Sequence, residues 1–145
     1  MATGVAYNSF KKALMEGSIN FNSDTIKVAL LDNTYTPNID SHKFFDDVSG
    51  DELSTAGGYT AGGVTLGSKT VTADTANDKG IFDAADPAWT ADGTGFTCRY
   101  AVMYKSTGDP ATSPLIAYWD FGGDQNPVSI AFTLIINAAG VLNIA

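Results

Sequence analysis

Alternation of apolar and polar positions is clearest between Thr97 and Lys105. One set of alternating positions is large and apolar, and it consists of Cys98, Tyr100, Val102 and Tyr104. The other set is mixed, which is typical of a sheet face that is partly covered or lies near a partner. No Gly or Pro interrupts the run, and its aromatic and β-branched residues favour extended backbone. The pattern predicts a central β-strand.

Further strands are predicted on both sides of this one. Asp24–Asp32 is apolar on both faces, so we expect both faces to be covered. The other expected strands are Val64–Thr72 with an interruption at Gly67, Gly80–Ala84, Leu115–Phe121, and a closing hairpin of Val128–Asn137 and Val141–Ile144 that turns near Gly140.

A short helix is predicted near the N-terminus. Phe10, Ala13 and Leu14 lie at i, i+3 and i+4 and form one apolar stripe. Asn8 or Ser9 is the expected N-terminal cap, and Gly17 is expected to end the helix with a left-handed conformation. Residues 1–23 are thus predicted to be a helix and an arm, which either covers an open end of the core or reaches a neighbouring subunit.

A long polar connection, residues 33–55, follows Asp24–Asp32, the first predicted strand of the chain. Pro37 blocks regular pairing, and one helical turn is expected at His42–Val48. Phe44 and Phe45 are expected to pin the connection to the body. A connection of this length with little structure is usually functional or held by a partner, so the segment is interpreted as a loop insertion.

These elements predict one domain over residues 1–145. We expect an all-β protein, an antiparallel, jelly-roll-like β-sandwich of about eight strands with a short N-terminal helix and a long polar loop insertion. The 15 Gly residues agree with many short turns.

Charge and cysteine content narrow the possible partners. The formal net charge is -8, and the eight basic residues are scattered along the chain, so binding to nucleic acid or to an anionic membrane is not expected. Cys98 is the only cysteine, so no internal disulfide forms, and a buried thiol is expected. Neither a signal peptide nor an apolar run of membrane-spanning length is evident, which predicts a soluble chain made in the cytoplasm.

No residue pattern points to catalysis or to a cofactor. His42 is the only histidine, which leaves no multi-histidine metal site, and the Gly pairs near Tyr59 lack the Lys-Ser or Lys-Thr of a phosphate loop. Two acidic groups offer oxygens for calcium: Asp46, Asp47, Asp51 and Glu52, and then Asp74 and Asp78 with Asn77. Neither follows the calcium-loop pattern, and solvated loop acids explain them more simply.

Aromatic residues in or near predicted turns are the remaining candidates for a binding site. Tyr7, Tyr35, Tyr59 and Trp89 suit sugar stacking or protein contact, and an equally good explanation is that they plug the ends of a sandwich.

The order of several motifs resembles a recurring family of small tailed-phage proteins. The similar segments run from near the N-terminus to the end of the chain: Asp24–Leu31, Tyr35–Asn38, Asp47–Val48, Gly58–Gly63, Phe82–Ala84 with Trp89, Arg99–Val102, Ser113–Ile116, Asp120–Gly122 and Ala138–Leu142. Members are commonly encoded among phage structural genes. The resemblance implies a virion component and carries no catalytic residues.

The resulting hypothesis is a non-enzymatic capsid decoration, or cement, protein on the virion surface. It would bind the major capsid protein as a homotrimer at local three-fold positions, with Tyr7, Tyr35, Phe44 and Phe45 in the contacts. Deletion of Thr36–Ser54 is then expected to leave the sandwich folded and to prevent attachment. The alternatives are a tail, neck or fibre-associated subunit, and a surface glycan-binding module using Tyr59 or Trp89. An enzyme is the hypothesis with the least support.

Overall fold

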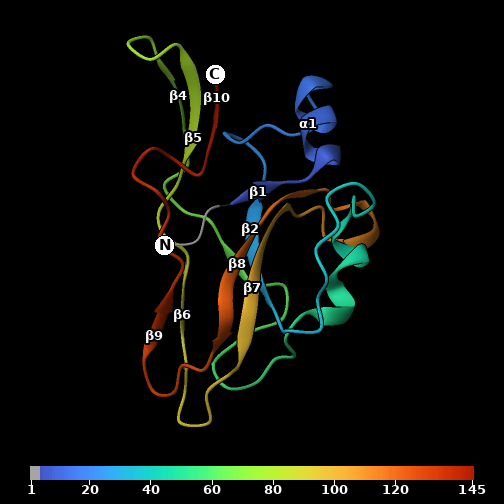
Figure 1. Ribbon diagram of the computed structural model, residues 1–145, viewed down its shortest axis with the longest axis vertical. Helices are drawn as coiled ribbons and strands as arrows, with labels where there is room; N and C mark the ends of the chain where they lie inside the picture. The colour runs from blue at the N-terminus through green and yellow to red at the C-terminus, as the bar shows by residue number, and fades with distance from the viewer. Residues whose placement is uncertain (1–3) are drawn as a thin grey trace.

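Five antiparallel strands form the main sheet of the computed structural model, which describes residues 4–145 (Figure 1). Their order across the sheet is β1 (Val5–Ala6), β8 (Leu115–Gln125), β7 (Cys98–Lys105), β2 (Ile26–Leu31) and β3 (Val64–Thr65). The prediction that the strand from Cys98 to Lys105 is central is confirmed.

Burial of β2 and β7 follows from their sequences. The two strands pair along their whole overlap, from Ile26 opposite Lys105 to Leu31 opposite Tyr100. Every residue of β2 except Lys27 is buried, which confirms that both of its faces are covered. Apolar side chains on both faces require a layer on each side of the sheet.

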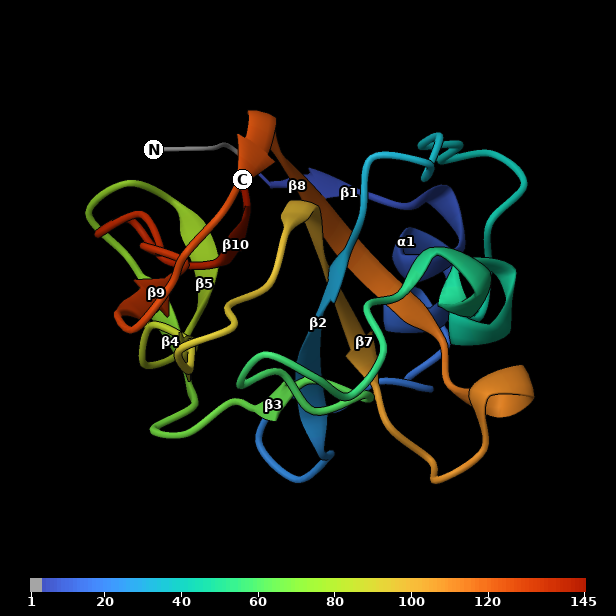
Figure 2. The same ribbon diagram turned by 90° about the horizontal axis from the view of Figure 1, so that it is seen from below.

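Two small antiparallel sheets supply one of these layers. One contains β10 (Leu142–Ile144), β5 (Lys79–Asp83) and β4 (Thr70–Asp74), and the other contains β6 (Ala88–Thr90) and β9 (Ala131–Thr133). Figure 2 shows both on one side of the main sheet, with the helix and the helical turns on the other. The fold is therefore all-β and antiparallel, as predicted, but sheets of five, three and two strands do not confirm a jelly roll.

Two predicted strand connections are wrong. The segment Val64–Thr72 is split between β3 of the main sheet and β4 of the three-stranded sheet, and Ser68 between them has a positive φ of 51°. The last two strands do not form a hairpin, because β9 pairs with β6 and β10 pairs with β5. Gly140 does take the expected positive φ, at 101°.

The N-terminal helix α1 (Asn8–Met15) lies where it was predicted, and Gly17 after it has a φ of 71°. The expectation of a cap by Asn8 or Ser9 is wrong, because Tyr7 is the N-cap residue and no side chain bonds there. The helix is held by packing instead, since the segment around it buries Tyr7, Phe10, Ile19 and Phe21 in the protein's own core.

Residues 33–55 are tied to the core through three buried side chains, Tyr35, Phe45 and Val48, while most of the segment is on the surface. The segment forms two short 3-10 turns, η1 (Phe45–Asp47) and η2 (Ser49–Asp51), in place of the single helical turn expected at His42–Val48. The Phe45 ring stacks on Tyr104 with centroids 4.1 Å apart, and Val48 is fully buried. The loop thus covers the face of β7 opposite the small sheets. Deletion of Thr36–Ser54 removes two buried residues, Phe45 and Val48, so we now expect it to destabilise the fold as well as to prevent attachment.

Cys98 is fully buried on β7, as predicted. Burial, with a smaller contribution from Asp124, raises the pKa of its thiol to about 12. Because the thiolate is the reactive form, we expect a maleimide or disulfide reagent to label the native protein far more slowly than the protein unfolded in denaturant. Equal labelling rates in the two states would contradict the position of Cys98 in the core.

Candidate functional site

Five of the six residues predicted to contact a partner are buried. Tyr7, Tyr35, Phe45, Tyr59 and Trp89 are each at most 4% exposed. The hypothesis that the four aromatics other than Phe45 are exposed is therefore wrong, whereas the expectation that Phe45 pins the loop to the body is confirmed. Only Phe44 is on the surface, at 40% exposed. The alternative explanation, aromatics that close the core, describes the other five.

Long-range hydrogen bonds explain why these tyrosines are buried. The Tyr7 and Tyr35 hydroxyls lie 2.6 Å apart, joining the N-terminal segment to the loop. The Tyr59 hydroxyl donates to Glu52 at 2.6 Å and accepts from the backbone N–H of Leu30. A buried phenol with such partners loses little on leaving water, and burial raises the pKa of both Tyr7 and Tyr59.

Loop carboxylates that were candidates for calcium binding serve as backbone and side-chain acceptors. Asp47 accepts from the N–H groups of Phe44 and Lys43, which lowers the pKa of its carboxyl group. Asp51 accepts from the Thr34 hydroxyl, and Asp74 accepts from Asn77 in the β4–β5 turn. Within residues 4–145, no three His, Cys, Asp or Glu side chains gather closely enough to hold a metal ion.

His42 lies at the edge of the tyrosine pair. Its Nδ1 is 3.3 Å from the Tyr35 hydroxyl, and its backbone carbonyl accepts from Ser9 of α1. The expectation of a solvated histidine is therefore only partly met, since the side chain is half-buried. Its neighbours indicate a role in joining the loop to the helix.

Phe44 lies on a groove of about 560 Å³ between α1, the loop and the segment after β7. Three lysines line this groove: Lys12, Lys43 and Lys105. Acids offset two of them, because Lys12 pairs with Glu16 at 2.6 Å and Lys105 pairs with Asp24 at 3.0 Å. Asp40 also lines the groove, so its charges are mixed and it has no strong preference for an anion.

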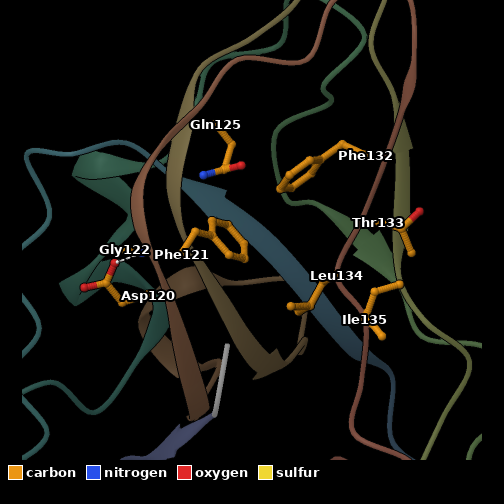
Figure 3. Close-up of a pocket in the computed structure, with 8 residues that line it drawn as sticks. All are labelled: Asp120, Phe121, Gly122, Gln125, Phe132, Thr133, Leu134 and Ile135. Atoms are coloured by element: carbon orange, nitrogen blue, oxygen red, sulfur yellow. Dashed lines mark hydrogen bonds between the residues drawn. The ribbon is translucent and has the colours of Figure 1, made fainter. Parts of the chain in front are cut away.

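A second groove, called here the aromatic groove, lies where β8 and β9 diverge (Figure 3). It measures about 410 Å³, and the rings of Phe121 and Phe132 line it with centroids 5.5 Å apart. Gln125 and Thr133 add polar groups. Asp120 is turned toward Gly122, whose N–H donates to it, and pairs with Arg99 at 3.2 Å, which lowers the pKa of the Asp120 carboxyl group.

A third groove, called here the apolar groove, lies between α1 and the β4–β5–β10 sheet. It measures about 560 Å³, and its floor includes Phe21 stacked on Phe82 with centroids 3.8 Å apart. Two apolar side chains on opposite walls are strongly exposed, Met15 of α1 at 83% and Ile144 of β10 at 60%. Aliphatic and aromatic groups dominate the lining, so the groove suits an apolar partner surface.

Sequence reasoning missed both of these grooves. The strand pairing explains the apolar groove. Val71 and Leu142 both lie opposite Phe82, so the three apolar side chains share one face of the small sheet. That signal is readable only once the sheet pairing is known. Met15 lies outside the helical stripe used to predict α1, and gave no signal of its own.

Comparison with known proteins adds no relative. No family model, curated protein or solved structure matches the chain. The likeness to small tailed-phage proteins therefore stays a prediction from its motifs. Within residues 4–145, no helix has the length and apolar character needed to cross a membrane.

Proposed function

We propose that this chain is a non-catalytic structural subunit of a tailed-phage virion, and that it decorates the capsid by binding the major capsid protein through the apolar groove. The observation that carries the proposal is the exposure of Met15 and Ile144 on the two walls of this groove. A contiguous exposed apolar surface costs free energy in water and commonly marks a protein–protein interface.

The motif resemblance supports the virion part of the proposal, and the acidic charge agrees with a partner that is not nucleic acid. The loop gives less support for attachment than expected, because two of its three aromatic residues, Tyr35 and Phe45, are buried and only Phe44 is exposed. In our proposal the apolar groove, and not the loop, attaches the subunit to the capsid. A subunit of the tail, neck or fibre would offer the same kind of surface. The position of the subunit in the virion distinguishes this alternative from a capsid decoration protein.

The test is co-sedimentation of purified protein with phage heads that lack it. Met15→Lys combined with Ile144→Lys should abolish binding, because it places a charge on each wall of the groove. Val128→Lys is the matched control, since Val128 is comparably apolar and exposed but lies outside the groove, and it should bind normally. Normal decoration by the double variant, or a virion map that places the subunit only in the tail, would overturn the proposal.

A glycan-binding module is the second candidate function, and the aromatic groove is the observation that favours it. Two Phe rings beside an amide and a hydroxyl can stack on and hydrogen-bond a sugar. The earlier expectation that Tyr59 or Trp89 binds the sugar is replaced, because both side chains are buried.

Under our proposal, titration calorimetry of the isolated protein with host surface polysaccharide shows no saturable binding. Saturable binding that Gln125→Ala weakens and Asn143→Ala leaves unchanged would rank the glycan function first. Asn143 is the matched control because it is exposed and distant in the sheet topology from the aromatic groove.

A further inference from the structure

Strand β4 (Thr70–Asp74) has a free edge. It is an outer strand of its sheet, and its first four residues are exposed, so both of its faces meet solvent. Within residues 4–145, only β5 forms backbone hydrogen bonds with Thr70–Ala73. Figure 1 shows the β4–β5 hairpin projecting beyond the main sheet, which leaves this edge accessible.

The sequence of β4 does not protect the edge from pairing. Thr70, Val71 and Thr72 are β-branched and favour extended backbone, and neither Pro nor Lys interrupts the strand. Exposed strand edges in natural proteins usually carry such blocking residues, because unpaired N–H and C=O groups recruit another strand. An unblocked edge that is exposed on both faces indicates a place for one more strand.

We propose that this edge pairs with β4 of a second copy of the chain, antiparallel and centred on Thr72. A two-fold axis through the centre then relates the copies, and both make the same contacts. The result is one six-stranded sheet in the order β10-β5-β4-β4-β5-β10. It is a dimer contact, in place of the homotrimer that the sequence predicted.

Charge favours the antiparallel arrangement. Asp74 ends the strand, whereas the ammonium of Lys69, just before the strand, donates to the backbone carbonyl of Asp24 and is not available to the contact. Parallel in-register pairing would bring Asp74 beside Asp74 of the second copy, whereas antiparallel pairing places each Asp74 opposite Thr70 of the second copy and avoids this repulsion.

The register follows from strand length and side-chain direction. Centring on Thr72 pairs all five residues of each strand, and a shift in either direction loses ladder hydrogen bonds. In this register Val71 lies opposite Ala73 of the second copy. Residues directly opposite each other share a face, so the apolar face formed by Val71, Phe82 and Leu142 continues across the contact.

Cysteine cross-linking tests both the contact and its register. Thr72→Cys places two thiols opposite each other, with Cβ atoms about 4.5–5.5 Å apart, close to the separation that a disulfide requires. Thr70→Cys is the matched control, because Thr70 lies on the same strand and face but roughly 13 Å from its counterpart at about 3.3 Å per residue. The buried Cys98 does not compete.

Under mild oxidation at high protein concentration, Thr72→Cys should form a disulfide-linked dimer at least ~10-fold faster than Thr70→Cys, given the distance that a disulfide tolerates. Equal rates for the two variants would overturn the proposed pairing. No cross-link from either variant would overturn it as well.

Sedimentation velocity of the protein without any added cysteine provides an independent measurement. The protein should show concentration-dependent dimers, and Thr72→Lys should weaken them several-fold because it opposes two like charges at the axis. Thr90→Lys, at an exposed position of strand β6 outside both named grooves, is the control and should have no effect. A trimer, or a monomer at every concentration, would contradict the dimer. Binding of the apolar groove to phage heads is measured in a different experiment, co-sedimentation. The dimer can therefore be disproved while head binding holds, and the reverse.

Discussion

Phe45→Ala should lower the free energy of unfolding by about 3–5 kcal/mol, the usual cost of truncating a buried phenylalanine. The Phe45 ring is 4% exposed and stacks on Tyr104, so its removal leaves a cavity between the loop and β7. Chemical denaturation followed by tryptophan fluorescence measures the change.

Phe44→Ala is the matched control, because the neighbouring ring is 40% exposed and makes no aromatic stack. We expect it to cost less than ~1 kcal/mol, as surface substitutions usually do. A similar loss of unfolding free energy in the two variants would show that residues 33–55 do not cover the face of β7 opposite the small sheets. The pair therefore measures whether the loop belongs to the core.

Gly63→Ala should be at least as destabilising, at about 4 kcal/mol or more, which is in the range reserved for steric or core disruption. Gly63 has a φ of 72°, and a Cβ there would lie 1.9 Å from the Val28 carbonyl oxygen. Because that oxygen belongs to β2 at the centre of the core, neither side can move without disturbing the pairing of β2 with β3.

Gly62→Ala separates this clash from the cost of the backbone conformation. Gly62 also has a positive φ, of 91°, but a Cβ there would meet nothing closer than 3.8 Å. It should lose only about 1–2 kcal/mol, the cost of a left-handed conformation for a residue with a side chain. Equal thermal stabilities for the two variants would argue against the close approach at Gly63.

Local patterns predicted the elements whose burial is decided by their own sequence. β2 and β7 are long, uninterrupted and apolar, and α1 has a stripe ended by Gly17, so their positions could be read directly. Strand partners could not be read in this way. The pattern of Leu142–Ile144 is that of a strand, but nothing in it shows that the partner is β5, far back in the chain.

The candidate sites were harder to predict for a related reason. Tyr7 and Tyr35 each lie beside a turn, where an aromatic is commonly exposed, and their burial rests on long-range contacts: their mutual hydrogen bond and packing on Tyr100 and Tyr118. Phe121 and Phe132 lie on strands of two different sheets, and both rings line one groove between them, which the patterns of the separate strands do not show. The exposure of these side chains depends on tertiary contacts, which the alternation of apolar and polar positions along a strand cannot predict.

The cover that residues 33–55 provide for β7 has a consequence for how the chain folds. The loop packs on Tyr100 and Tyr104, which are made long after it, so it can dock only once β7 has been synthesised and paired with β2. Contacts between such distant segments form slowly. During that interval the aromatic face of β7 is open to water and to other nascent chains. We therefore expect the yield of soluble protein to fall with growth temperature and to recover when chaperones are overproduced.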